Sequence, residues 1–124
     1  MTQLPTQRLT TATSPPRPHP QDPTDAQVET AVRSFALLAD PTRVRLLWAI
    51  RDGGVDVATL AGVAGCSPTV ASQHLSKLRF AGLVEGVRDG RRVRYRIRGG
   101  HVRRLLEEAL FQADHVLTGE PVHD

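Results

Sequence analysis

Helix start and stop signals between Asp56 and Gly82 constrain the fold of this chain more than any other feature of its sequence. Asp56 is placed to cap one short helix, and Gly65 is placed to end it. Ser67 can cap a second helix that has Pro68 at its first position, and Gly82 follows as a stop signal. Two short helices joined by a glycine-containing turn predict a helix-turn-helix.

A β-hairpin is predicted directly after the second of these helices. The stretches LVEGVR and RRVRYRIR lie on either side of Asp89-Gly90, a dipeptide typical of tight hairpin turns. Val93, Tyr95 and Ile97 alternate with arginines along the second strand. That strand should therefore have one apolar face and one cationic face.

Three more helices are expected around this unit. Thr24 and Gln27 have the spacing of a capping box at the start of the first helix, and Asp40 can cap the second at Pro41. The second helix, PTRVRLLWAI, is apolar on most sides and should be central. The first helix should bury one stripe, made of Val28, Val32, Phe35 and Leu38. The last helix, HVRRLLEEALFQADHVL, has its own stripe, made of Val102, Leu105, Leu106, Ala109, Ala113 and Val116.

The composition divides the chain into three parts. Residues 1–23 are proline-rich and lack apolar periodicity, which predicts a disordered arm. Residues 24–117 hold all the expected elements and form one domain, and residues 118–124 form a C-terminal tail. The predicted fold is mostly α with a two-stranded β-wing, a winged helix-turn-helix of order α-α-α-α-β-β-α that dimerises through its first and last helices.

Several classes of protein are excluded by what the sequence lacks. Cys66 is the single cysteine, so no intrachain disulfide forms and a reducing cytoplasm is expected. No apolar run approaches the roughly 20 residues that span a bilayer, so no membrane association is predicted. There is no glycine-rich phosphate loop, nucleophile motif or paired carboxylate typical of a catalytic site. We therefore expect neither an enzyme nor an organic cofactor.

Small polar side chains dominate one face of the second helix of the helix-turn-helix. On a helical wheel Val70, Ala71, Leu75 and Leu78 share the opposite, core-facing side. Hydroxyl and amide side chains suit base edges in the major groove, whereas cationic ones suit phosphates. His74 lies nearer the apolar side, and its role as a packed, phosphate-contacting or base-reading residue stays open. The predicted DNA contacts of this helix are Ser67, Thr69, Ser72, Gln73, His74, Ser76, Lys77 and Arg79.

The hairpin carries a concentration of positive charge. Six arginines between Arg88 and Arg98 accompany a single acid, Asp89. Like charges on neighbouring positions repel, and DNA phosphates would relieve that repulsion. The alternative, a solvated polar surface, fits this charge imbalance less well. The predicted phosphate contacts are Arg88, Arg91, Arg92 and Arg94.

Three stretches in this order, LLADPTRVRLLWAI, SQHLSKLRFAGLV and RDGRRVRYRI, resemble the ArsR/SmtB family of winged-helix transcriptional repressors. The resemblance covers roughly residues 31–115. It implies a homodimer that binds double-stranded DNA at a palindromic operator and leaves it when an inducer binds. Two-fold symmetry of the protein would match two related half-sites.

Histidines near the C-terminus suggest what is sensed. One helix would hold His101 and His115 about 21 Å apart, so they would meet only across two antiparallel helices of a dimer. HVRRLLEEALFQADH followed by a tail histidine resembles the nickel- and cobalt-responsive actinobacterial branch of the family. That resemblance implies metal ligands at His101, Asp114, His115 and His123. Gly99 replaces an aspartate of many zinc-sensing relatives, which favours nickel or cobalt over zinc.

Two other interpretations of these histidines stay open. In the first, they form the polar flank of an amphipathic dimer helix and have no ligand role. In the second, the chain is a DNA-binding subunit without metal sensing of its own, regulated by a partner protein or by another ligand.

Overall fold

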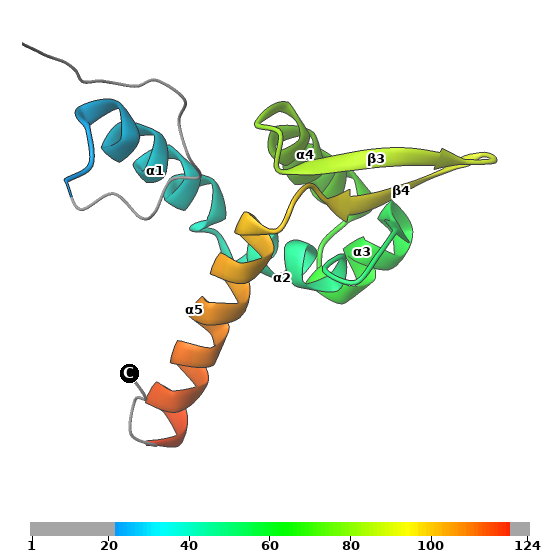
Figure 1. The fold of residues 1–124 in the computed structure, drawn as a ribbon. Helices are drawn as coiled ribbons and strands as arrows, with labels where there is room; N and C mark the ends of the chain where they lie inside the picture. Colours follow the sequence, from blue (N-terminus) through cyan, green and yellow to red (C-terminus); the bar gives the residue numbers. More distant parts are fainter. Residues whose placement is uncertain (1–21, 120–124) are drawn as a thin grey trace, which may run out of the picture. The chain divides into compact units, whose positions relative to one another are not determined.

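The computed structural model describes residues 22–119. Nearly all of the predicted arm, residues 1–23, and most of the predicted tail, including His123, lie outside the described residues. The contacts divide the chain after Val32, so helix α1 begins in one unit and ends in the next. The described elements are α1 (Asp25–Leu38), α2 (Pro41–Ala49), β2 (Val55–Asp56), α3 (Val57–Ala64), α4 (Pro68–Phe80), β3 (Val84–Asp89), β4 (Arg92–Ile97) and α5 (His101–Thr118) (Figure 1).

The predicted helix caps are confirmed. Thr24 and Gln27 exchange two hydrogen bonds, from Gln27 N to Thr24 Oγ1 (3.1 Å) and from Thr24 N to Gln27 Oε1 (2.9 Å). Asp40 caps α2, Asp56 caps α3 and Ser67 caps α4, each accepting from the backbone N–H three residues ahead. A cap of this kind stabilises a helix by about 1 kcal/mol. These local contacts fix where each helix begins.

The core lies where α2, α3 and α4 meet the start of the hairpin. Leu46 and Leu47 of α2 are fully buried, which confirms that this helix is central. Leu75 and Leu78 of α4 are also fully buried. The other buried residues are Ile50, Leu60, Ala61, Ala64, Ala71, Val84 and Leu106. Cys66 is half-buried and packs against this cluster.

The sheet differs from the predicted two-stranded wing. A third, two-residue strand, β2, pairs with β4, and the strand order is β2-β4-β3. Val55 of β2 therefore lies opposite Tyr95 of β4. In the hairpin Asp89 pairs with Arg92, so the turn is one residue later than predicted and consists of Gly90-Arg91. Gly90 has φ +65°, a conformation that favours glycine.

The predicted stripe on α1 is not buried in the single chain. Val28, Val32 and Phe35 are 47%, 58% and 56% exposed, and only Leu38 packs against the core. The prediction of a buried stripe is wrong for one chain, because α1 has no buried residue. Burial would require a second surface.

Helix α5 is also largely uncovered. Leu106 is buried, and Val102 and Leu110 are half-buried. The other members of the predicted stripe are exposed in the single chain, namely Leu105, Ala109, Ala113 and Val116. Phe111 and Leu117, 61% and 85% exposed, add to this apolar surface. Among residues 22–119, no helix is long and apolar enough to cross a membrane.

Candidate nucleic-acid interface

Helix α4 presents two different faces. Its core side holds Ala71, Leu75 and Leu78, which are fully buried. Val70 was predicted on that side but is 37% exposed, because it lies in the first turn of α4, at the edge of the core. The opposite side consists of four exposed polar residues, Thr69, Ser72, Gln73 and Ser76. Burial of one side against α2 and α3 therefore aims these hydroxyl and amide groups outward.

An open hollow of about 730 Å³ lies along the exposed side of α4. Thr69, Ser72, Gln73, His74, Ser76 and Lys77 line it, together with Arg43 and Pro68. Six of the eight predicted DNA contacts of α4 thus share one surface. Ser67 also caps α4, because its Oγ accepts a hydrogen bond from Val70 N at 3.1 Å. Arg79 is exposed with Lys77 in the last turn of the helix.

The sequence did not indicate a role for Arg43, which the structure places beside the predicted contacts. Its Nε donates to His74 Nδ1 at 3.1 Å, and its Nη1 donates to the Leu37 carbonyl at 3.1 Å. Its backbone N–H donates to Asp40 Oδ2 and holds the pKa of that carboxyl below its usual value. His74 is half-buried, which agrees with its predicted position nearer the apolar side of the helix.

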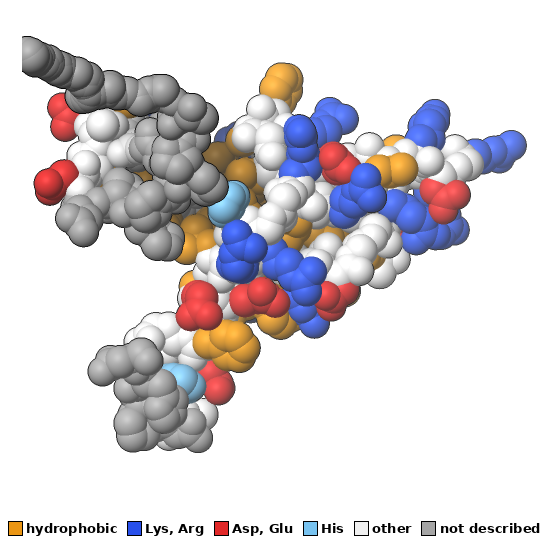
Figure 2. All heavy atoms as spheres, viewed as in Figure 1, with side chains coloured by type: hydrophobic (Ala, Val, Ile, Leu, Met, Phe, Trp, Pro, Cys, Tyr) orange, Lys and Arg blue, Asp and Glu red, His pale blue; other side chains and the backbone are white. Residues whose placement is uncertain are grey.

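The repulsion among the arginines of the β3–β4 hairpin is weaker than the sequence suggested, because several of them have acidic partners. Figure 2 shows blue arginine side chains along the hairpin with red acidic side chains among them. Arg92 pairs with Asp56 at 3.1 Å and Arg94 with Asp89 at 2.8 Å. Glu85 pairs with Arg96 at 2.6 Å and with Arg98 at 3.7 Å. The expectation that Asp89 alone faces six arginines is therefore wrong, because Asp56 and Glu85 are brought to the strand from elsewhere in the chain.

Two arginines of the wing are not paired with an acidic side chain among the described residues. Within residues 22–119, Arg88 and Arg91 have no acidic partner, and both are exposed beside the hairpin turn. Arg91 is one of the two turn residues, and Arg88 lies opposite Val93. An unpaired guanidinium loses no internal ion pair when it meets a phosphate. Arg88 and Arg91 are therefore better prepared for phosphate than Arg92 and Arg94, each of which already has an acidic partner.

The predicted metal ligands lie at the two ends of α5. His101 is exposed at the first position, with its Nδ1 3.2 Å from Arg104 Nη2. Asp114 is exposed and His115 half-buried in the last turns, and His123 lies beyond the described residues. Across residues 22–119 of one chain, no three His, Cys, Asp or Glu side chains are grouped to hold a metal ion. His101 and His115 are not brought together within one chain.

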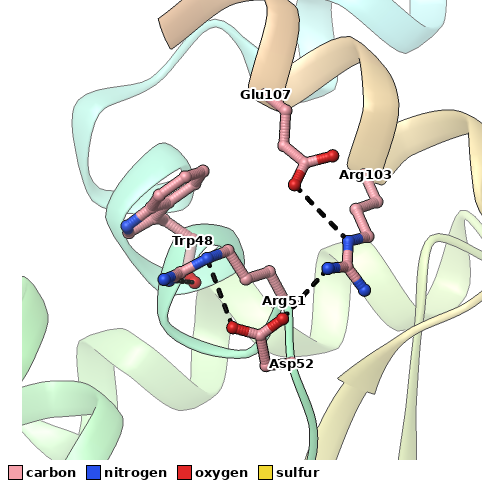
Figure 3. Close-up of polar contacts among 5 residues, drawn as sticks. All are labelled: Trp48, Arg51, Asp52, Arg103 and Glu107. Carbon is pink, nitrogen blue, oxygen red and sulfur yellow. Dashed lines mark hydrogen bonds and ion pairs between the residues drawn. The ribbon is translucent and has the colours of Figure 1, made fainter.

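A chain of polar contacts connects the end of α2 with α5 (Figure 3). Asp52 accepts from Arg103 Nη2 of α5 at 3.0 Å and lies 3.5 Å from Arg51 Nε. Arg103 also pairs with Glu107, one turn later in α5, at 3.6 Å. The guanidinium of Arg51 lies 3.8 Å from the centre of the Trp48 ring. The first turns of α5 are thereby tied to the turn that precedes β2.

Known proteins share both the sequence and this arrangement. A helix-turn-helix domain model matches residues 38–87. The HTH-type transcriptional regulator KmtR of Mycobacterium tuberculosis is 44% identical over 112 residues, covering 90% of this chain and 83% of that protein. The crystal structure of the AntR antimony-specific transcriptional repressor is 33% identical with a TM-score of 0.72, covering 86% of this chain and 99% of that one. A homodimeric winged helix-turn-helix DNA-binding domain from Mycobacterium bovis is 32% identical with a TM-score of 0.69, covering 84% and 99%.

These similarities decide the class of protein. The relatives are transcriptional regulators, which confirms the prediction that the chain is not an enzyme. The fold, with its helix-turn-helix and hairpin wing, is that of the similar structures. The chain is a DNA-binding transcriptional regulator and belongs to the ArsR/SmtB family.

Proposed function

We propose that the chain represses transcription as a homodimer bound to a palindromic operator, with one α4 in the major groove of each half-site. The observation that carries this proposal is the exposed polar side of α4, which lines an open hollow of about 730 Å³. Gln73 suits adenine and the hydroxyls of Ser72 and Ser76 suit bases or phosphates. Arg88 and Arg91 then contact the backbone beside the groove, while Lys77 and Arg79 flank the reading face.

Uncovered apolar side chains support the homodimer. Phe111, Val116 and Leu117 leave much of the second half of α5 apolar and exposed. Val28, Val32 and Phe35 do the same for α1. Apolar surface of this extent favours association because burying it removes it from water. The similar domain from Mycobacterium bovis is itself a homodimer.

The proposal includes a nickel or cobalt ion held between the two α5 helices by His101, Asp114, His115 and His123. Imidazole and carboxylate groups suit these borderline metals. The described residues of one chain do not group three such ligands, and His101 and His115 lie at opposite ends of α5. Pairing of antiparallel α5 helices would bring His101 of one subunit to His115 of the other. The similar AntR structure is named as an antimony-specific repressor, so regulation by a metal-like inducer has a precedent on this fold.

The residues of α5 would transmit such binding to DNA through the contacts of Figure 3. A shared ion would supply a bond between the subunits. His101 and His115 would then fix the rotation of one α5 against the other. Arg103 holds α5 to Asp52, and the following β2 pairs with the wing strand β4. A rotation of α5 would thereby change the spacing of the two α4 helices, and by linkage DNA would alter metal affinity by the same factor.

One experiment tests this proposal. The affinity of the purified protein for an operator duplex is measured by fluorescence anisotropy at fixed salt, first with chelator and then with nickel, cobalt or zinc. A tenfold change, equivalent to about 1.4 kcal/mol, with nickel or cobalt is expected. No change with any of the three would contradict metal sensing and favour a regulator that takes its signal from a partner protein or another ligand.

The double substitution of His101→Ala and His115→Ala supplies the matched control. Operator affinity in chelator should equal that of the wild type, since neither side chain is near α4 in the sequence or lines its hollow. The metal response should disappear. A double variant that still responded to the metal would remove these histidines from the proposed site.

A further inference from the structure

The contact between Arg43 and His74 determines which hydrogen-bonding group His74 can offer. A guanidinium has only donors, so its Nε–H can bond to Nδ1 only if that nitrogen carries a lone pair. The distance from Arg43 Nε to His74 Nδ1 is 3.1 Å. The single proton of the neutral imidazole must then be on Nε2. The tautomer of His74 is thus set by a residue 31 positions earlier in the chain.

Arg43 is itself held in place by three elements. Its backbone N–H donates to the Asp40 carboxylate at the start of α2. Its Nη1 donates to the carbonyl of Leu37 near the end of α1, and its Nε donates to His74 of α4. Part-burial of these contacts excludes much of the competing water. Because the guanidinium is hydrogen-bonded through both Nε and Nη1, the side chain has little freedom to turn away. It therefore acts as a fixed donor against which the imidazole is oriented.

His74, which Arg43 orients, also lines the hollow beside α4. His74 lines the same open hollow as Ser72, Gln73 and Ser76. Since Nδ1 is engaged by Arg43, Nε2–H is the group that His74 has left for a ligand in that hollow. A protonated Nε2 can donate but cannot accept.

We propose that His74 donates a hydrogen bond from Nε2 to an acceptor on the DNA, and that Arg43 is the positioning residue that keeps it a donor. The proposal rests on the proposed placement of α4 in the major groove. The acceptor is an oxygen or nitrogen lone pair, which DNA offers at the N7 of both purines, at guanine O6, at thymine O4 and at phosphate oxygens. Adenine N6 and cytosine N4 present donors and would be rejected at this position.

The first test addresses the free protein. Nitrogen-15 NMR of the full chain with labelled histidine should show, near neutral pH, an unprotonated Nδ1 and a protonated Nε2 for His74. Arg43→Met should convert this pattern to a mixture of the two tautomers. A proton on Nδ1 in the wild type would overturn the inference.

The second test addresses binding to an operator duplex selected from random sequences. His74→Asn keeps an acceptor near the position of Nδ1 but has no group that reaches the position of Nε2, so binding should weaken about tenfold, the worth of one good hydrogen bond. His74→Gln places an amide N–H near the position of Nε2 and should recover most of that loss. Equal binding by wild type and His74→Asn would overturn the inference. Urea unfolding of both variants excludes misfolding as the cause of weaker binding.

The third test identifies the acceptor. Single purines of the duplex are replaced by their 7-deaza analogues, single guanines by 2-aminopurine, which lacks O6, and single thymines by 5-methylpyrimidin-2-one, which lacks O4. In separate duplexes single phosphates are replaced by methylphosphonate. The substitution that weakens wild-type binding but not His74→Asn binding marks the partner of Nε2. Coupling to a base analogue identifies base reading, and coupling to a methylphosphonate identifies backbone contact. Absence of coupling at every position would overturn the inference.

Gln73→Ala separates this inference from the proposed function. If Gln73→Ala weakens operator binding while every His74 variant binds normally, α4 reads DNA and the inference about His74 alone fails. If neither side chain matters, the placement of α4 in the major groove fails with it.

Discussion

Leu78 and Phe80 lie two residues apart in α4 and have opposite surroundings. Leu78 is fully buried, whereas Phe80 is 92% exposed. We expect Leu78→Ala to lower the free energy of unfolding by about 2–5 kcal/mol, because it leaves a cavity in the core. Phe80→Ala should change it by less than about 0.5 kcal/mol. Urea unfolding followed by circular dichroism measures both, and a comparable loss in the two variants would contradict these positions.

Among the elements, the start of α3 links folding to pH. The backbone N–H and the hydroxyl of Thr59 bond to Asp56 and, with Arg92, hold the pKa of its carboxyl below the usual value. A carboxyl with a lowered pKa in the folded state stabilises the fold above its unfolded pKa of about 3.9, and that stabilisation is lost as the pH falls through the folded pKa. Asp56→Asn keeps a capping oxygen but cannot ionise.

We therefore expect Asp56→Asn to be less stable than the wild type at pH 7 and less sensitive to acid below about pH 4. Urea unfolding of both proteins across this range checks the expectation. Parallel pH profiles for the two proteins would show that the charge of Asp56 contributes nothing to the fold.

The elements also show why some features were predictable from the sequence and others were not. Caps such as those of Asp40 and Ser67 join residues three positions apart, so a local pattern contains the whole interaction. Strand β2 forms only because β4, some 40 positions later, supplies its partners at Tyr95 and Arg94. A two-residue strand has no periodicity of its own to reveal it.

In the candidate site, too, local features could be predicted from the sequence and contacts between distant residues could not. The polar side of α4 could be read from helical spacing, because it depends on that helix alone. The contact of Arg43 with His74 and the pairing of Arg92 with Asp56 span 31 and 36 positions. Such contacts depend on how the elements pack. The sequence therefore indicated the polar side of α4 and the basic wing, but not which of these side chains are already engaged within the protein.

For the whole molecule, the distribution of charge predicts how binding responds to salt. Each phosphate contact contributes about 0.9 to the slope of log affinity against log salt. Arg88→Ala with Arg91→Ala should reduce the slope by about 2 per subunit bound. The matched control is Arg96→Ala, because Arg96 is already paired with Glu85 and should change the slope less. An equal reduction by the control would contradict the assignment of Arg88 and Arg91 as the phosphate contacts.

The contact between Trp48 and Arg51 gives the protein an intrinsic fluorescent probe. The chain contains a single tryptophan, so its fluorescence arises from one place. A cation 3.8 Å from the indole ring influences its emission, and that cation neighbours Asp52, to which Arg103 of α5 is bound. A movement of α5 away from α2 would break the contact of Arg103 with Asp52. It would thereby change the emission wavelength or intensity of Trp48. The movement of α5 on which regulation would depend can therefore be followed in the native chain without an attached dye.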